Sequence, residues 1–299
     1  MPTKRVVVIA NKWWEADPLC AVLIHDKARP AAVSDFKYLN FPAVRAVQPK
    51  PGDPRPADPT PKPRMTFSCG GAAVEVWCLE ELMNPAENSS SSLEKARVLP
   101  GAISYGAKPD LVIAFGTAGS REGVSANGCA VIGRRVFVHD PKPKQGLWTP
   151  PQPDQVVDSA FPSAAFGKIS IEARHSAEAR LVHPPMSPAQ PPLVLLGDGF
   201  ISVGVVNITN YADYAWADRE AEEGFAKVRV SGQIGSIETT HGIIRAASKS
   251  PFLFVSGITD SEGLFDFQVT PRVYAQNFVC AHNAGVALAW LLPEIAAQL

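Results

Sequence analysis

The sequence predicts an α/β sandwich with a largely parallel or mixed sheet. Short apolar runs typical of buried strands alternate with segments of helical character through most of the 299 residues. Hydrophobic residues make up 46% of the chain, which is enough for one large core, and the length alone does not require two domains.

Two apolar strands in the first half of the chain end at turns with ligand-binding character. Residues 5–10 form the first strand, and a helix is expected from Glu15 to about His25. Residues 109–115 form the second, which runs directly into Gly116–Ser120. Glycines allow backbone N–H groups to approach a ligand oxygen closely, although a plain tight turn fits the same residues. The dinucleotide and Walker fingerprints are both absent.

Local signals define several other elements. Residues 65–69 and 72–79 are predicted to form a hairpin. Ser91 and Glu94 make a capping box that opens a helix, which Pro100 should kink or break.

Two proline-rich segments, near 45–64 and 141–155, are expected to be loops, because proline is excluded from helix interiors and central strands.

In the second half of the chain, strands are expected at 129–138, 193–196 and 227–231. Helices are expected at 211–223 and from Thr270 to about Ala296.

The most informative stretch carries two carboxylates, Glu238 and Asp260. Residues 235–247 have the pattern of a helix opening, which puts Glu238 at the mouth of that helix. Residues 251–257 form a buried strand, and Asp260 lies just past its carboxyl end, where open α/β sheets bind ligands. Buried carboxylates are costly unless they are paired or used. Helix and turn capping would also explain both residues.

Composition excludes several classes of function. The net charge of −1 gives no basic field for nucleic acid or an anionic membrane. Five dispersed cysteines favour reduced thiols, and neither they nor the histidines have metal-ligand spacing, so neither a metal nor a cofactor is expected. No run of about 20 apolar residues is present, so we expect a soluble cytoplasmic protein.

Four patches of the chain are similar to the nucleoside phosphorylase and nucleosidase superfamily, above all to the branch that hydrolyses 5'-methylthioadenosine and S-adenosylhomocysteine. They are Val7–Glu15, Asp110–Gly119, Gly197–Ile201, and Ser236–Glu238 together with Thr259–Asp260. This resemblance implies a three-layer sandwich with a central mixed, mostly parallel sheet. It also implies one domain over residues 1–299, with the proline-rich segments as insertions.

The resemblance assigns a role to each of three carboxylates. Asp260 would be the general acid at purine N7, Glu238 would hold the ribose 2'- and 3'-hydroxyls, and Glu15 would activate the attacking water. These residue types suit the chemistry, because the departing purine must gain a proton while positive charge develops on the sugar.

The resemblance also implies contacts to the rest of the substrate. Phe200 would stack on the base, Ile201 would meet it through backbone groups, and Thr117 and Gly116 would lie near the water or phosphate site. Ile237 stands where the family has a methionine against the sugar. The proline-rich insertions near 45–64 and 141–155 could reshape the mouth of the site, so the resemblance does not define which 5' group is accepted.

Hydrolysis is the function expected from these residues. The phosphorylase branches usually carry an arginine just before the glycine loop, where this chain has Ala114 and Phe115. A phosphate-dependent phosphorylase is the alternative, and a nucleoside-binding protein without turnover is a further one. The expected partner is a small-molecule purine nucleoside, and a homo-oligomer, with a dimer favoured, is expected by resemblance.

Overall fold

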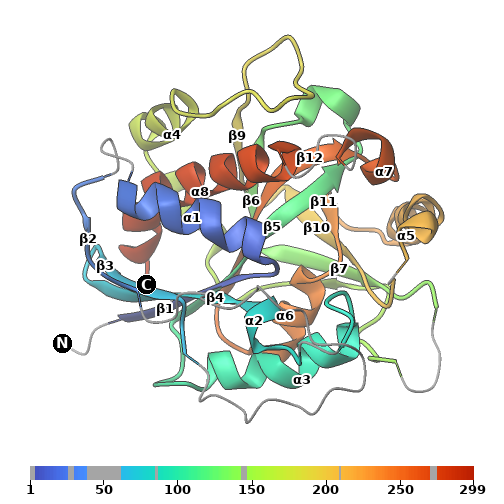
Figure 1. Cartoon of the computed structure of the whole chain (residues 1–299), viewed down its shortest axis with the longest axis horizontal. Helices are drawn as coiled ribbons and strands as arrows, with labels where there is room; N and C mark the ends of the chain where they lie inside the picture. Colours follow the sequence, from blue (N-terminus) through green and yellow to red (C-terminus); the bar gives the residue numbers. More distant parts are fainter. Residues whose placement is uncertain are drawn as a thin grey trace.

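The computed structural model describes residues 4–25, 30–38, 62–84, 87–142, 147–208, 210–269 and 275–299. Within these residues a mixed sheet lies between helices on both sides, which confirms the predicted fold class (Figure 1). The strands are β1 (Lys4–Ala10), β2 (Val33–Tyr38), β3 (Met65–Cys69), β4 (Ala72–Cys78), β5 (Leu111–Ser120), β6 (Ala130–Gly133), β7 (Arg135–His139), β8 (Val156–Val157), β9 (Val194–Leu196), β10 (Phe200–Val205), β11 (Gln233–Glu238) and β12 (Phe252–Ser261).

The helices are α1 (Trp13–His25), α2 (Leu79–Leu82), α3 (Ser92–Ile103), α4 (Ile171–Glu178), α5 (Tyr214–Lys227), α6 (His241–Ala247), α7 (Phe265–Gln268) and α8 (Ala275–Ala296). The main path of the sheet is β2-β3-β4-β1-β5-β11-β10-β7-β8, and β12 pairs with both β5 and β6. The central ladders β4/β1, β1/β5, β5/β12 and β11/β10 are parallel, whereas the hairpin strands at one edge pair antiparallel.

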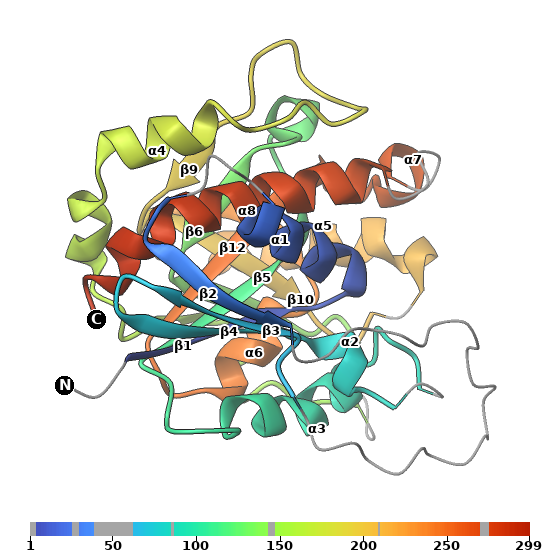
Figure 2. The same ribbon diagram turned by 60° about the vertical axis from the view of Figure 1, so that its left-hand side comes forward.

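Successive side chains of the central strands point to opposite faces of the sheet and pack into two separate hydrophobic cores. Val6 and Val8 face the layer of α1 and α8, while Val7 and Ile9 face the layer of α3 and α6. Figure 2 shows α1 and α8 together on one side of the sheet and α3 and α6 on the other. This two-sided burial explains why the central strands have continuous apolar sequences.

Helix α8 packs directly on β12. A Cβ at Gly257 would lie 2.1 Å from the carbonyl oxygen of Cys280, so only glycine permits this approach. Among the described residues, α8 is the one helix that is long and apolar enough to cross a membrane. Of its most apolar stretch of 18 residues, 67% is buried inside the protein. Its apolar composition is therefore accounted for by the core.

Several predicted elements are confirmed. Strand β1, helix α1, the β3–β4 hairpin and helix α5 lie close to their expected positions. Ser91 caps α3 by accepting a hydrogen bond from the N–H of Glu94 at 3.2 Å, but α3 continues through Pro100 to Ile103. The predicted start of the last helix at Thr270 and most of the 45–64 segment lie outside the described residues, and residues 147–155 contain neither helix nor strand.

The predicted helix opening at 235–247 is wrong in its first half. Residues Gln233–Glu238 form β11, which pairs in parallel with β10, and α6 begins only at His241. The short strand predicted at 227–231 is instead the connection between α5 and β11. Long-range strand pairing overrides the local helical pattern here, and it places Glu238 at the carboxyl end of a strand.

The single strand predicted at 129–138 is two strands interrupted at Arg134. Before the break, β6 pairs with β12 and β9, and after it, β7 pairs with β10 and β8. The strand predicted at 193–196 is confirmed as β9, but a further strand, β10, follows it after Gly197–Gly199.

Candidate active site

A cavity opens at the carboxyl ends of the central strands. It lies where β1, β5, β11 and β12 end, and side chains from α5, α7 and α8 complete its walls. Its space, including the open mouth, is about 870 Å³, a size suited to a small molecule. The predicted site residues that line it are Glu15, Gly116, Thr117, Ile237, Glu238 and Asp260.

Glu15, in the first turn of α1, is only 3% exposed. Its Oε1 accepts hydrogen bonds from the N–H of Thr117 at 2.7 Å and from the hydroxyl of Thr117 at 2.9 Å. Its Oε2 accepts one from the N–H of Lys12 at 2.8 Å. Burial raises the pKa of Glu15, and these hydrogen bonds oppose that rise. A carboxylate has about four acceptor positions, so Oε2 keeps one for a water.

The end of β5 lies between two of the carboxylates. A Cβ at Gly116 would be 3.0 Å from Glu15 Oε1, and a Cβ at Gly119 would be 3.4 Å from Asp260 Oδ2. The glycines predicted to let a ligand approach the backbone thus also let two acidic side chains lie against it.

Glu238 sits at the end of β11 and faces the first turn of α6. Its Oε2 accepts hydrogen bonds from the N–H groups of Thr240 and His241, the latter at 2.8 Å. Its Oε1 receives one long hydrogen bond from the hydroxyl of Ser202 at 3.4 Å. For Glu238, the position at a helix end that was considered from sequence is therefore correct, and Oε1 still has acceptor capacity toward the cavity.

Asp260, near the end of β12, is 4% exposed. Its Oδ1 accepts a hydrogen bond from the hydroxyl of Thr259. Burial raises its pKa to about 7; the Thr259 hydrogen bond opposes this and the charge of Asp218 adds to it. A large fraction of Asp260 is therefore protonated at neutral pH, as a proton donor requires.

Sequence reasoning missed the wall formed by α5 and α7. Tyr214 and Phe265 line the cavity as an edge-to-face pair with ring centroids 6.3 Å apart. Asp218 lines it too and accepts a hydrogen bond from the N–H of Gly263 at 2.9 Å, and burial raises its pKa to about 7. Acidic and aromatic residues are common on helices such as α5 and α7, so nothing in the local sequence indicates that these three side chains line a cavity.

A fully buried lysine lies beneath the site. Lys95 of α3 donates a hydrogen bond from Nζ to the hydroxyl of Thr240 at 2.9 Å. Burial lowers its pKa to about 7, with a smaller contribution from Lys12, while the charges of Glu238 and Glu15 oppose the decrease. No local pattern singles out this residue, because its neighbours are determined by tertiary packing.

The structure does not bring Phe200 and Ile201 to the cavity. The register of β10 and β11 pairs Phe200 with Gln233 and Gly204 with Glu238, so Phe200 and Ile201 start β10 at the end remote from Glu238. The side chain of Ile201 is fully buried in the core beside α5. From these positions, neither residue can contact a base bound in the cavity, contrary to the expectation from sequence.

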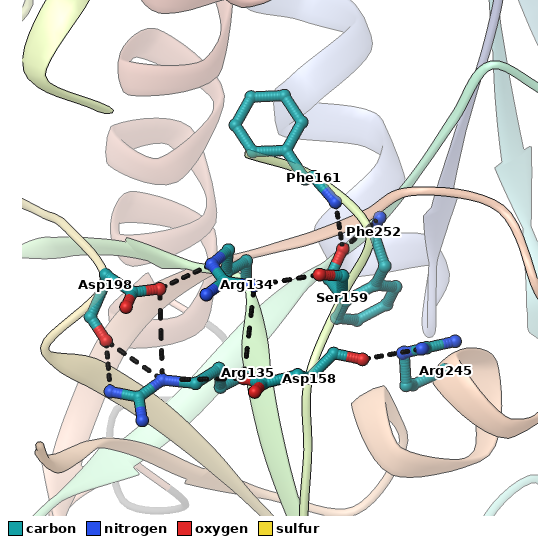
Figure 3. A network of polar contacts seen from close by, with 8 residues as sticks. All are labelled: Arg134, Arg135, Asp158, Ser159, Phe161, Asp198, Arg245 and Phe252. Carbon is teal, nitrogen blue, oxygen red and sulfur yellow. Dashed lines mark hydrogen bonds and ion pairs between the residues drawn. The ribbon is translucent and has the colours of Figure 1, made fainter. Parts of the chain in front are cut away.

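Arginines anchor the Gly197–Gly199 turn that precedes Phe200. Arg135 Nε donates to the carbonyl oxygen of Asp198 at 3.0 Å, and Arg134 Nη1 donates to that of Ser159 at 2.8 Å (Figure 3). This network gives the Gly-Asp-Gly-Phe segment a structural role at the amino end of β10.

Few cations face the cavity. Among the described residues, Lys12 is the only lysine or arginine in its lining, and its Nζ donates to the carbonyl oxygen of Ser89 at 2.7 Å. Arginines elsewhere in the sequence could in principle supply a phosphate site. Of these, Arg121 pairs with Glu222 at 3.0 Å, Arg134 and Arg135 bind the turn before β10, and Arg45 lies outside the described residues.

Comparisons with known proteins identify the fold. No family model and no curated protein sequence matches the chain. Among solved structures, a 5'-methylthioadenosine/S-adenosylhomocysteine nucleosidase from Colwellia psychrerythraea, in complex with adenine, matches 99% of this chain and 96% of its own at a TM-score of 0.55 and 14% identity. The chain has the fold of these nucleosidases.

Two further structures with this nucleosidase fold agree over nearly their whole length. The nucleosidase from Neisseria meningitidis, in complex with methylthio-immucillin-A, matches at a TM-score of 0.54 and 16% identity, covering 97% of this chain and 99% of its own. Futalosine hydrolase of Helicobacter pylori matches at 0.54 and 11% identity, with 99% of each chain covered.

Proposed function

We propose that this protein hydrolyses the N-ribosidic bond of a purine nucleoside. The observation that carries the proposal is that Glu15, Glu238 and Asp260, which come from separate parts of the sequence, line one cavity around the end of β5. Glu15 follows β1, and Glu238 and Asp260 lie near the ends of β11 and β12; all three of these strands pair with β5. All three are nearly buried, and Asp260 has a pKa suited to donating a proton near neutral pH. The shared fold with nucleosidases supports the same assignment.

The proposed reaction uses one carboxylate for each change of charge. Protonated Asp260 donates its proton to N7 of the purine as the C1'–N9 bond breaks and the bonding electrons go to the base. Glu238 accepts hydrogen bonds from the ribose hydroxyls and stabilises the positive charge that develops on the sugar. Glu15 takes one proton from the water whose oxygen forms the new bond to C1'.

Water rather than phosphate is the nucleophile in this proposal. A phosphate site is normally built with arginine, whose planar group binds two oxygens at once. The lining residues of the described chain include no arginine, and the Nζ of Lys12 is already bonded to Ser89. Among the described residues, a phosphate-dependent reaction would therefore have no bidentate arginine to bind the anion, only a single lysine that is already hydrogen-bonded.

A panel of nucleosides tests the proposal. Purified full-length protein is incubated with adenosine, methylthioadenosine, S-adenosylhomocysteine, inosine and guanosine, with and without phosphate, and free base is measured. We expect base release that does not depend on phosphate and that the Asp260→Asn variant loses. Strict phosphate dependence would establish a phosphorylase instead, and tight binding without base release would establish a nucleoside-binding protein.

A further inference from the structure

The two carboxylate oxygens of Glu238 are held in different ways. Oε2 accepts hydrogen bonds from the backbone N–H groups of Thr240 and His241 at the start of α6. The one hydrogen bond that Oε1 accepts within the described residues comes from the hydroxyl of Ser202, at 3.4 Å. Each carboxylate oxygen has about two acceptor positions, so Oε1 is the oxygen with capacity left for a sugar. The direction of Oε1 therefore depends on a side chain, whereas that of Oε2 depends on the backbone.

Strand β10 provides the surface against which Oε1 lies. Ser202 and Gly204 are two residues apart on this strand, so they face the same side of the sheet. A Cβ at Gly204 would be 3.4 Å from Oε1 of Glu238, and the side chain of Ser202 is fully buried. The glycine thus leaves room for the carboxylate beside the serine hydroxyl.

The hydroxyl of Ser202 also contacts the imidazole of His241. The distance from its Oγ to Nδ1 of His241 is 3.0 Å. His241 lines the cavity and is only 2% exposed, and its ring lies beside that of Phe254 with centroids 5.8 Å apart. Burial lowers the pKa of His241, and the charge of Glu238 opposes this decrease. The imidazole is therefore neutral at neutral pH, with a proton on one of its two nitrogens.

The single proton of the Ser202 hydroxyl sets the direction of both hydrogen bonds. An ionised carboxylate only accepts, so the hydroxyl donates to Oε1 of Glu238 and must accept from the N–H of His241. In the opposite direction the hydroxyl proton would point at Nδ1, and the lone pairs of two oxygens would face each other. The bonding pattern therefore assigns the imidazole proton to Nδ1. Donation to a hydroxyl oxygen also strengthens the bond that this hydroxyl donates.

We propose that His241 is a positioning residue, which acts through Ser202 to orient Oε1 of Glu238 toward the hydroxyls of a ribose. This inference rests on the proposed function, in which Glu238 binds those hydroxyls. Without a donor at Nδ1 the serine proton can turn away from the carboxylate, and Oε1 loses its support. Because a nucleoside without sugar hydroxyls does not use Oε1, the chain of hydrogen bonds from His241 favours ribonucleosides selectively.

Two nucleosides and three variants test the inference. We measure kcat/KM for adenosine and for 2',3'-dideoxyadenosine, which lacks both sugar hydroxyls, and the affinity for free adenine. Ser202→Ala should lower the ratio of the two kcat/KM values about tenfold or more. His241→Gln should do the same, because its amide lies farther from Cγ than Nδ1 does. His241→Asn carries an amide nitrogen close to the position of Nδ1 and should retain most of the ratio. The affinity for adenine should stay as in the wild type.

The control is Ser256→Ala, which removes another fully buried hydroxyl. Ser256 donates to the hydroxyl of Ser236 in β11 at 3.1 Å, and it does not line the cavity, so the ratio should not change. A wild-type ratio in Ser202→Ala overturns the inference, and so does an equal loss on both nucleosides together with weaker adenine binding. If His241→Asn loses as much as His241→Gln, the ring only fills space. Release of no base by the wild type would instead refute the proposed function, and the ratio of the two nucleoside Kd values would then test the hydrogen-bond chain.

Discussion

Glu15 and Thr117, 102 residues apart in the sequence, are joined by two hydrogen bonds to one carboxylate oxygen, from the backbone at 2.7 Å and from the hydroxyl at 2.9 Å. This pairing occupies Oε1 and leaves the acceptor capacity of the carboxylate on Oε2. We infer that Thr117 orients the carboxylate of Glu15, the general base of the proposed reaction.

Removing the charge of Glu15 should affect chemistry more than binding. We expect Glu15→Gln to lower kcat by about a hundredfold or more, since a general base typically contributes ~10²–10⁴ in rate. Thr117→Val keeps the backbone bond but loses the hydroxyl, so its decrease should be smaller, about tenfold. Single-turnover rates measure both effects. If the two variants weaken substrate binding but leave the rate of a single turnover unchanged, Glu15 is not the base.

The pH dependence of turnover tests Asp260. The pKa of Asp260 is raised to about 7, so its proton is present below that pH and is lost as the pH rises through it. We expect wild-type kcat/KM to fall above pH 7, and Asp260→Asn to lower it at least about a hundredfold at pH 6. Asp218 has a pKa in the same range, so Asp218→Asn is the comparison. A basic limb abolished by Asp218→Asn but not by Asp260→Asn would assign the acid to Asp218.

Stability should depend on pH in opposite directions at Asp260 and Lys95. Because the pKa of Asp260 is raised in the folded state, the stabilising contribution of this carboxyl group to the free energy of unfolding is fully present below about pH 3.8. It is lost as the pH rises through 7. Because the pKa of Lys95 is lowered to about 7 in the folded state, the stabilising contribution of its neutral amine to the free energy of unfolding is fully present above about pH 10.5. It is lost as the pH falls through 7. We therefore expect Asp260→Asn to raise Tm most at pH 8 and Lys95→Met to raise it most at pH 6.

The Lys95→Met variant should also lose activity. The Lys95 ammonium group bonds the hydroxyl of Thr240, whose backbone N–H binds Glu238, so its removal weakens the support of the ribose-binding carboxylate. A stabler protein with turnover reduced about tenfold or more is the expected combination. Thermal melts at pH 6 and pH 9, together with kcat/KM at pH 6.5, measure it. An equally active Lys95→Met protein would show that this lysine has no part in positioning Glu238.

Glu238 is expected to separate binding of the sugar from binding of the base. Glu238→Gln keeps the size of the side chain but weakens the hydrogen bonds to ribose, so we expect nucleoside affinity to fall about tenfold or more while free adenine binds nearly as before. Titration calorimetry in the Asp260→Asn background, where we expect turnover to be at least about a hundredfold slower, measures both. Equal losses for nucleoside and adenine would show that the change has disturbed the cavity as a whole.

The strand ends could be predicted from sequence better than the walls of the site. Glu15 and Asp260 follow apolar runs that are long and continuous because both of their faces are buried, so periodicity located them. Glu238 was singled out at the mouth of a predicted helix, but the structure has it at the end of a strand, and only the resemblance assigned its role. Lys95, beneath the site, and Asn277, in the lining of the cavity, come from helices whose orientation is determined by packing, and no spacing rule predicts such positions.

The position of Phe200, away from the cavity, suggests that another aromatic ring stacks on the base. The likeness of Gly197–Ile201 to a base-binding segment assigned the stacking ring to Phe200, but the arginine network holds that turn at the other end of β10. The aromatic side chains of the described residues that line the cavity include Tyr214 and Phe265 as well as Trp14, and Phe200 is not among them. We expect Phe265→Ala to weaken adenine binding about tenfold, since stacking on an aromatic ring typically contributes ~1–3 kcal/mol per base, while Phe200→Leu leaves it unchanged. Loss of adenine affinity in Phe200→Leu, with Phe265→Ala unaffected, would restore the assignment made from sequence.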